Sequence, residues 1–490
     1  MEFLAANMAP LMFGSLVIFL LFGYPVAFAL AANGVVFGLI GIQLGLLTPA
    51  LFQALPDRIF GVMSNDTLLA IPFFTFMGLI LERSGMAEDL LDTIGQLFGP
   101  VRGGLAFAVI FVGAILAATT GVVAASVISM GLISLPIMMR YGYDQRVATG
   151  VIAASGTLAQ IIPPSLVLII MADQLGRSVG DMYQGALIPG LVLTCMYVGY
   201  VALVAVFKPA YVPALPPEAR TLRGVKLFVR VLTTLLPPLM LIFLVLGTIF
   251  LGVATPTEGG AMGAFGALAM AVLRKRLSWA LLKQAMESTA KLTTFVVMIL
   301  VGARVFSLTF YGVEGHLWVE HLLSNLPGGR IGFLVAVNLL IFFLAFFLDY
   351  FELSFIVVPL LAPVAEKLGI DLIWFGVLLG VNMQTSFMHP PFGFALFYLR
   401  SVAPPSVKTS QIYWGAVPFV LIQIIMVGLI ITFPQLVTMG LETQEKIDTD
   451  KVEIIVPDSA PSDEEAIQFD SPTPEDAAKA LDKSAPDDKK

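Results

Sequence analysis

The chain has 490 residues, of which 58% are hydrophobic and only 12% are charged, and its mean hydropathy is +0.91. A soluble chain carries roughly 25% charged residues, so these values exclude an ordinary soluble protein. The net charge of −7 arises in 441–490, where 15 Asp/Glu and 6 Lys/Arg give −9 and leave +2 for the remaining residues. The apolar part is therefore close to neutral, and we expect no nucleic-acid partner.

Long apolar segments dominate the chain, and stretches such as 235–251 and 417–433 contain no charged side chain. Each is about long enough to cross a ~30 Å hydrocarbon core at 1.5 Å per residue. We therefore predict an all-α polytopic protein embedded in a lipid bilayer. The expected apolar segments are 10–47 (two, divided at 23–25), 68–81, 105–139, 147–172, 186–207, 231–251, 259–273, 292–310, 331–365, 372–399 and 416–437.

Two of these segments, 105–139 and 331–365, are about 35 residues long, too long for one crossing. A re-entrant hairpin that dips into the membrane and returns fits each of them, provided that its turn is buried in protein. The Pro-rich connector 208–230 holds five cations, and a further basic cluster occupies 274–283. The positive-inside rule places both in the cytoplasm. We also predict an interfacial amphipathic helix over 277–290.

An internal repeat appears when the sequence is shifted by 227 residues. Pro136, Gly142 and Asp144 then fall on Pro363, Gly369 and Asp371, and the Pro-Pro pair at 163 falls on that at 390. The predicted topology orients the two copies oppositely. Inverted repeats with interrupted helices at matching positions are typical of secondary transporters, which bind substrate near the midplane between the breaks. The alternative is that the prolines merely kink two helices.

The repeat predicts the domain organisation. We expect a first half at 1–207 (hairpin about 105–140, broken helix about 145–175), a basic cytoplasmic connector at 208–230, a second half at 231–440 (hairpin about 331–365, broken helix about 372–399) and an acidic disordered tail at 441–490.

The two breaks are unusually polar for apolar helices, and both 155–165 and 382–391 contain hydroxyl and amide side chains. A break frees backbone carbonyls, which suit a dehydrated Na⁺, and a helix N-terminus, which suits a carboxylate. The alternative is that the hydroxyls bond carbonyls of their own helix. His389 lies at depth, where it is either a substrate or proton ligand or a structural histidine.

The hairpin tips are the other candidate positions. The first contains Thr119, Thr120 and Gly121 among small residues, and the second contains Asp349 and Glu352. An intramembrane carboxylate is a functional candidate, although it can also cap free amides or pair with a cation.

A capping motif and the absence of a nucleotide-binding loop are two further features of the sequence. Thr255, Pro256 and Glu258 predict a helix-starting capping box. No G-x-x-x-x-G-K-[ST] loop occurs in the sequence, so we do not expect direct drive by ATP.

At these residues the chain resembles the large membrane subunit of TRAP transporters (tripartite ATP-independent periplasmic transporters). The resemblance covers about residues 10–437. It rests on Leu69-Ala70-Ile71-Pro72-Phe73-Phe74-x3-Gly78, Met138-x2-Tyr141-Gly142-Tyr143-Asp144, Ile161-Ile162-Pro163-Pro164-Ser165, Thr255-Pro256-Thr257-Glu258 and Asn382 through Pro390-Pro391-x-Gly393. It departs from the family at Thr120-Gly121-Val122-Val123, where Ser-Gly-Ser-Ser is usual, and at His389-Pro390-Pro391, where Thr-Pro-Pro is usual.

The resemblance implies a sodium-driven elevator carrier of the bacterial inner membrane, in which hairpins and broken helices move against a scaffold. It also implies a small four-helix membrane subunit and a periplasmic binding protein that delivers an organic acid. The context of Ser386 and Gly393 is similar to the branch associated with 2-oxo acids and related monocarboxylates.

We accordingly predict two sets of site residues. The expected sodium ligands are Thr119, Thr120, Gly121, Ser155, Thr157, Asp349, Asn382, Thr385 and Ser386. The expected substrate-binding residues are Pro163, Pro164, Ser165, His389, Pro390 and Pro391. Sodium is the only metal expected, with no organic cofactor and no enzymatic activity. The alternatives are a stand-alone sodium/carboxylate symporter, a channel, and an intramembrane enzyme using Asp349, Glu352 and His389.

Overall fold

The computed structural model describes residues 2–324 and 326–441, except for the side chains of residues 2, 119 and 120. The acidic tail predicted at 441–490 lies outside the described residues from 442 onward. Residues up to Leu441 form one compact unit, and every regular element in the described part is a helix. This agrees with the predicted all-α class.

The helices follow one another along the chain with short connections. The first half contains α1 (Glu2–Ala6), α2 (Met8–Leu21), α3 (Val26–Gln43), α4 (Leu55–Met63), α5 (Ala70–Arg83), α6 (Met86–Phe98), α7 (Gly104–Thr120), α8 (Val123–Arg140), α9 (Gln145–Thr157), α10 (Leu166–Leu175) and α11 (Val179–Phe207). The second half contains α12 (Gly224–Phe250), α13 (Pro256–Leu273), α14 (Trp279–Gly312), α15 (Gly315–Ser324), α16 (Gly329–Leu344), α17 (Tyr350–Glu352), α18 (Val358–Lys367), α19 (Leu372–Gln384), α20 (Phe394–Val402), α21 (Thr409–Thr432) and α22 (Gln435–Thr438).

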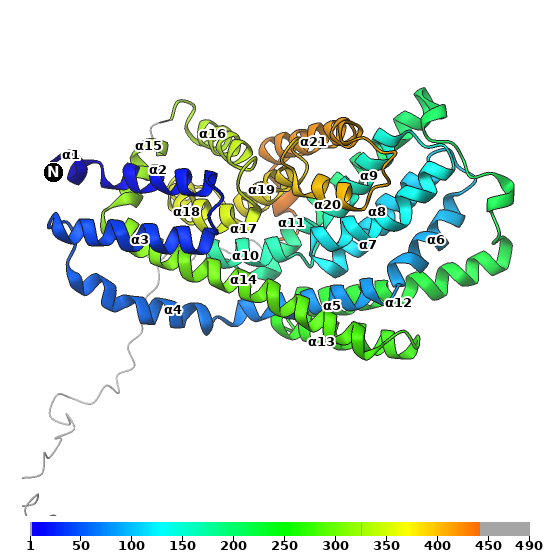
Figure 1. Ribbon diagram of the computed structural model, residues 1–490, viewed down its shortest axis with the longest axis horizontal. Coiled ribbons are helices and arrows are strands. Elements are labelled where there is room, and N and C mark those ends of the chain that lie inside the picture. Colours follow the sequence, from blue (N-terminus) through cyan, green and yellow to red (C-terminus); the bar gives the residue numbers. More distant parts are fainter. Residues whose placement is uncertain (1, 325, 442–490) are drawn as a thin grey trace, which may run out of the picture. The chain divides into compact units, whose positions relative to one another are not determined.

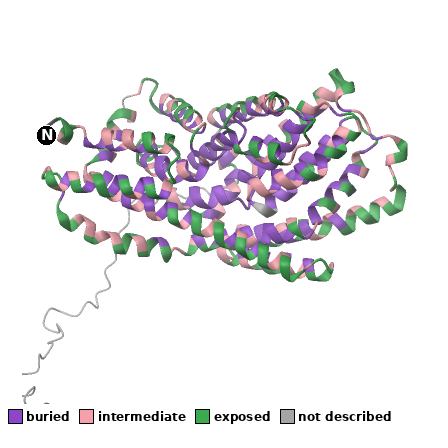
Figure 2. Cartoon of the chain, in the orientation of Figure 1, coloured by how far each residue is buried: buried purple, intermediate pink, exposed green. Residues whose placement is uncertain are grey.

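Within the described residues, six helices are long and apolar enough to cross a membrane, and up to eight spans result if each bent helix pair counts as one. The six are α3, α8, α11, α12, α14 and α21. Figure 2 shows burial concentrated on the central helices, whereas α12 and α13 on the outside carry many exposed residues. Exposed side chains such as Phe243 and Phe265 are apolar, as expected for a surface that faces lipid.

The structure changes two expectations about local structure. A helix is present over most of the predicted 277–290 segment, but it is the first part of α14, which runs unbroken from Trp279 to Gly312. The charges of Lys283 and Glu287 interrupt the hydropathy of this segment but not its helix, where their side chains pair at 3.8 Å. The helices α4, α6 and α15 were not predicted from the sequence, because each mixes apolar with polar or charged residues and contains no long apolar run.

The repeated Gly-x-Asp motif has a structural explanation. Gly142 and Gly369 follow α8 and α18 with φ of +80° and +68°, a conformation that favours glycine. Asp144 then caps α9 by accepting the amides of Arg146 and Val147, and Asp371 caps α19 by accepting the Trp374 amide at 2.7 Å. Each motif therefore ends a hairpin and starts a broken helix.

The hairpins differ in how they turn. In the first, α7 ends at Thr120, Gly121 follows it with a φ of +58°, and α8 starts at Val123. In the second, α16 is followed by irregular residues 345–349, by the short α17 and by a π-helical turn over Leu353–Val357 that leads into α18. Figure 1 shows α7 and α8 toward one end of the long axis, and α16 and α18 toward the other.

The two repeats also interlock through equivalent contacts. A Cβ on Gly156 of α9 would collide with Val127 of α8, and 227 residues later the Ser354 hydroxyl lies 3.6 Å from the sulfur of Met383. In addition, α8 of the first hairpin packs on α20, and α18 of the second hairpin packs on α10. Each hairpin thus packs against the broken helix of its own repeat and of the other repeat.

Glycines allow the helix pairs to approach closely. Gly415 of α21 faces the Arg146 carbonyl of α9, and Gly185 of α11 faces Ile373 of α19. Residues 146 and 373 are again 227 positions apart, so the two crossings are equivalent. In the outer helices, a Cβ on Gly34 of α3 would lie 2.7 Å from the Val305 carbonyl oxygen of α14. Small residues are the usual means of such packing in membranes.

We expect Gly415→Ala to destabilise the protein, because its methyl group would overlap the Arg146 carbonyl. Overpacking of this kind costs about 1–3 kcal/mol, so the thermal midpoint in detergent should fall. The matched control on the same helix is Gly428→Ala, since nothing lies within 4 Å of a Cβ at that position. Equal midpoints for the two variants would contradict the close crossing.

Candidate functional site

The first break lies wholly inside the protein. Helix α9 ends at Thr157, a 3₁₀ turn covers Leu158–Gln160, and α10 starts at Leu166. Pro163 and Pro164 stop the helix because proline has no amide hydrogen and disfavours helical geometry in the residue before it. Both prolines and the following Ser165 are buried.

The second break is open on one side. Helix α19 ends at Gln384, a 3₁₀ turn covers Thr385–Phe387, and α20 starts at Phe394. His389 is buried, Pro390 is half-buried and Pro391 is exposed. The exposure of the three substrate-binding residues predicted here therefore increases from His389 to Pro391.

Several predicted sodium ligands hydrogen-bond backbone carbonyls of their own helix, which is the alternative that the sequence left open. The Ser155 hydroxyl donates to the Val151 carbonyl at 2.6 Å, and the Thr385 hydroxyl donates to the Asn382 carbonyl at 2.6 Å. The Asn382 amide donates across to α16, where it contacts the Asn338 carbonyl at 2.8 Å. These side chains stabilise the broken helices, and their oxygens retain further acceptor capacity.

Thr157 joins the two breaks. Its hydroxyl donates to the Ala154 carbonyl at 2.8 Å and accepts from the Gln384 amide at 3.1 Å, although these partners come from opposite repeats. The Thr157 hydroxyl thus connects α9 and α19. Nearby, the Tyr197 hydroxyl of α11 accepts from the Gln423 amide of α21 at 2.9 Å, which connects these two helices. Residues 157 and 384 are equivalent in the repeat, so they meet where the two copies meet.

Other buried polar groups at the breaks have no protein partner. Both amide atoms of Gln160, the hydroxyl of Ser386 and both ring nitrogens of His389 lack a hydrogen bond within the described structure. The His389 ring lies between Phe342 and Phe346, with centroid distances of 4.3 and 4.4 Å. Leaving such a group unsatisfied costs about 1–3 kcal/mol, so these atoms are suited to binding a ligand, an ion or ordered water.

The hairpin tips contact the breaks. A Cβ on Gly121 would lie 3.2 Å from the side chain of Leu166, which places the first tip beside the first break. The side chains of Thr119 and Thr120 lie outside the described residues. At the second tip, the Asp349 carboxylate accepts the Glu352 amide, and the Glu352 carboxylate accepts the Asp349 amide, each at 3.1 Å. Asp349 therefore caps a helix, one of the alternatives left open by the sequence.

The capping box predicted at Thr255 is confirmed. The Glu258 amide donates to the Thr255 hydroxyl at 3.2 Å, and the Thr255 amide donates to the Glu258 carboxylate at 2.8 Å. This motif lies at the start of α13, and it serves to begin a helix.

A cavity of about 940 Å³ lies between the second hairpin tip and the outer helices. Its lining includes Tyr24 before α3, Lys291 on α14, and Phe347 and Glu352 of the hairpin. It reaches Phe394 at the start of α20, but no predicted sodium or substrate ligand lines it. Within the described residues, no group of three or more His, Cys, Asp or Glu is arranged to hold a metal ion.

The structure thus divides the predicted residues into two neighbouring groups, one at each break. Sequence reasoning missed Gln160, Gln384, Tyr197 and Gln423. A glutamine inside an otherwise apolar helix was the available signal, because such a side chain requires a partner at depth.

We expect Thr157→Val to be less stable than Thr157→Ser. Valine keeps the volume but leaves the amide of Gln384 without its partner, at a cost of about 1–3 kcal/mol. Serine keeps the hydroxyl. Thermal unfolding of the two variants in the same detergent tests this, and equal midpoints would show that the connection contributes nothing.

A model of the family described as "Tripartite ATP-independent periplasmic transporter, DctM component" matches residues 13–436. The C4-dicarboxylate TRAP transporter large permease protein of Vibrio cholerae is 30% identical over 429 residues, which are 82% of this chain and 92% of that protein. Its counterpart in Pseudomonas aeruginosa is 28% identical over 397 residues, covering 81% and 91%. The sialic acid TRAP transporter permease protein SiaT of Haemophilus influenzae is 27% identical, covering 79% and 61%.

The solved structure of the YdaH transporter from Alcanivorax borkumensis has a similar fold, with a TM-score of 0.58 at 14% identity, covering 86% of this chain and 98% of that one. The family match spans nearly all of the described residues and confirms the resemblance seen in the motifs. The chain therefore belongs to the DctM family and is a multi-pass transporter permease of the bacterial inner membrane rather than an enzyme.

Proposed function

We propose that this permease uses a sodium gradient to take up a small organic acid delivered by a periplasmic binding protein. The observation that carries the proposal is the meeting of two helix breaks at Thr157 and Gln384, with unpartnered polar groups on both sides. Interrupted helices of two repeats that face each other at depth form the binding sites of many secondary transporters.

Sodium suits the chemistry of the first break. Residues 155–166 contain no Asp, Glu, Lys or Arg, so the available ligands are hydroxyl, amide and backbone carbonyl oxygens. Such oxygens can replace the hydration shell of a monovalent cation. Gly121 brings the backbone of the first hairpin tip to the same place. The family description "ATP-independent" supports an ion gradient as the energy source.

The second break suits the substrate. His389 has two ring nitrogens without a protein partner, whereas the free hydroxyl of Ser386, three residues before it, stays a proposed sodium ligand at the boundary with the first break. The substrates in the names of the relatives are C4-dicarboxylates, sialic acid and isethionate, all of which are small organic anions. We infer a carboxylate for this chain, with 2-oxo acids and other monocarboxylates as the narrower candidates.

The word "tripartite" in the family description supports two partners. The isethionate relative is a permease protein named DctMQ, and this chain covers 64% of its length. We propose that the remaining functions are supplied by a small four-helix membrane subunit and by the periplasmic binding protein.

We further propose an elevator movement of two inverted repeats, at 1–207 and 231–440, joined by a cytoplasmic connector at 208–230. The hairpins and broken helices interlock and would move together, while the lipid-facing α12 and α13 would belong to the scaffold. The cavity beside the second hairpin tip lies where such a movement would separate the two parts.

Uptake into proteoliposomes tests the function. The permease would be reconstituted with and without a small TRAP subunit and a TRAP binding protein from the same organism, and supplied with labelled pyruvate, succinate, sialic acid or isethionate. We expect saturable uptake that requires an inward sodium gradient and the binding protein. Uptake without the binding protein would favour a stand-alone symporter, and uptake that neither saturates nor needs sodium would favour a channel.

We expect Ser386→Ala to raise the sodium concentration for half-maximal uptake. A hydrogen-bonding group that contacts an ion contributes about 1.5–3 kcal/mol, which corresponds to roughly a tenfold change or more. Ser401→Ala is the matched control, because that serine is exposed on α20 and bonds only the Tyr398 carbonyl. An unchanged sodium dependence in Ser386→Ala would remove this residue from the ion site.

We expect His389→Phe to raise the KM for substrate about tenfold with little change in sodium affinity, because it loses both ring nitrogens. The phenyl ring would keep the stacking against Phe346, so stability should be preserved. His389→Gln keeps a donor and should recover part of the affinity. Equal substrate KM values for the wild type and His389→Phe would assign the histidine to packing alone.

A further inference from the structure

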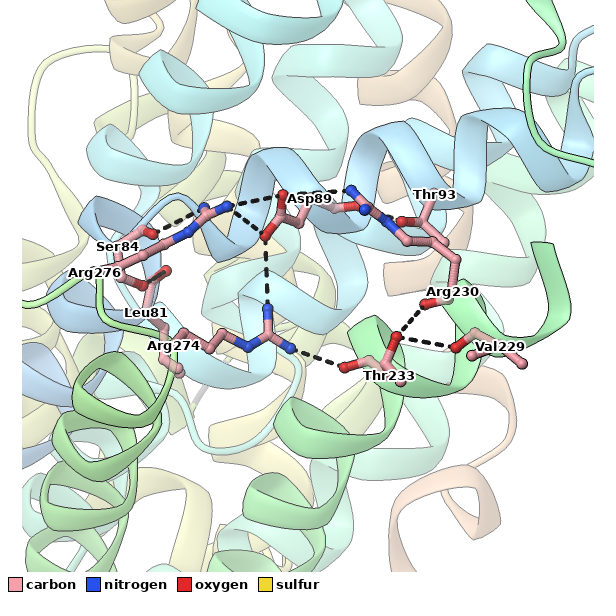
Figure 3. Close-up of polar contacts among 9 residues, drawn as sticks. All are labelled: Leu81, Ser84, Asp89, Thr93, Val229, Arg230, Thr233, Arg274 and Arg276. Atoms are coloured by element: carbon pink, nitrogen blue, oxygen red, sulfur yellow. Dashed lines mark hydrogen bonds and ion pairs between the residues drawn. The ribbon is translucent and has the colours of Figure 1, made fainter. Parts of the chain in front are cut away.

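Three arginines converge on one carboxylate at the end of the molecule that the positive-inside rule assigns to the cytoplasm (Figure 3). The Asp89 carboxylate of α6 lies 3.0 Å from Arg276, 3.6 Å from Arg274 and 3.8 Å from Arg230. Arg230 belongs to α12, and the other two follow the end of α13. We call these four residues the Asp89 cluster.

The Asp89 cluster has an excess of positive charge. Asp89 compensates one of the three guanidinium groups, and among the described residues these arginines form ion pairs with no other carboxylate. The arginine side chains are 24–47% exposed, so they are held in place yet open to one side. Guanidinium groups this close repel one another unless a further anion lies between them.

The arginines are fixed by additional bonds. Arg274 donates to the Thr233 carbonyl of α12 at 2.9 Å, and Arg276 donates to the Ser84 carbonyl at 3.2 Å. Figure 3 shows Arg276 and Arg230 directed toward Asp89 from opposite sides, and Arg274 directed toward it from below. Because these bonds hold the guanidinium groups in a converging arrangement, the cluster is a built feature rather than a random group of surface cations.

The surroundings place the cluster at the edge of the membrane. On α12, the exposed side chains of Phe228 and Leu232 lie on either side of Arg230 in the sequence. In the same way, the exposed Leu273 precedes Arg274, and the exposed Trp279 follows Arg276. Exposed apolar side chains face acyl chains, and tryptophan is enriched at the level of the lipid headgroups. The excess charge thus coincides with the depth of lipid phosphates.

We propose that the Asp89 cluster binds the phosphate of an anionic phospholipid from the cytoplasmic leaflet. Arginine forks match phosphate oxygens geometrically, and basic pockets between helices on this side are suited to such headgroups. The bound lipid would connect α6, α12 and the end of α13. Since α6 joins α5 to the first hairpin, the lipid would hold that connection against the outer helices.

Lipid titration of the full-length protein tests this inference independently of transport. The thermal midpoint and native mass spectra would be recorded in detergent with added phosphatidylglycerol, with phosphatidylcholine and with inorganic phosphate. We expect phosphatidylglycerol alone to raise the midpoint and to stay bound. Equal effects of phosphatidylglycerol and phosphatidylcholine would overturn the proposal. If inorganic phosphate alone raised the midpoint, the cluster would bind free phosphate and not the phosphate of a lipid.

Variants locate the site. Arg230→Gln with Arg274→Gln should weaken phosphatidylglycerol binding at least about tenfold, since each arginine near an anionic lipid contributes a factor of roughly five. The matched double variant Arg102→Gln with Arg140→Gln removes the same charge from the same end of the protein and should bind normally. Asp89→Asn distinguishes an anion-binding site from a purely structural cluster of ion pairs. If the cluster binds an anion, this variant should bind the lipid more tightly, because its net positive charge is higher. Unchanged or weaker binding in Asp89→Asn, or equal loss in both double variants, would refute the site.

Discussion

Backbone groups in the interior of a membrane must find hydrogen-bond partners within the protein, and this constraint governs the whole fold. The chain breaks two helices at depth, and each break would be costly if lipid surrounded it. The first break is instead enclosed within the protein, and the second is open on one side only. Every residue of α9 from Val147 to Thr157 is buried. The outer helices are consequently left to face the lipid.

The contact between Thr157 and Gln384 shows why the two breaks act as one unit. Equivalent positions of a repeat can touch only where the copies meet, so this hydrogen bond marks the junction. Because each hairpin packs on broken helices of both repeats, neither break can shift without moving the other. A packing arrangement of this kind would give a physical basis for the coupling that the proposed sodium-driven uptake requires.

The sequence predicted features whose causes are local. Glycine with positive φ, an aspartate cap and a proline pair act within a few residues, so both Gly-x-Asp motifs and the Thr255 capping box were foreseeable. Amphipathic α6 and the unbroken α14 were not, because charges lowered the hydropathy of segments that tertiary packing keeps helical. The hydrogen-bond partner of a buried side chain likewise could not be predicted from the sequence. Gln423 and Tyr197 are 226 residues apart, and only the folded chain brings them to 2.9 Å.

Charge is distributed in the way that reversible transport demands. In our proposal the Asp89 cluster lies at the membrane edge, where water and headgroups solvate ions, whereas the breaks offer mainly neutral oxygens and amides. A full counter-charge at the centre would bind sodium tightly and slow its release, and in the empty state it would itself be costly to bury. Neutral ligands avoid both problems. The Asp349 carboxylate accepts the Glu352 amide at the start of α17, so one of its oxygens already has a partner within the protein.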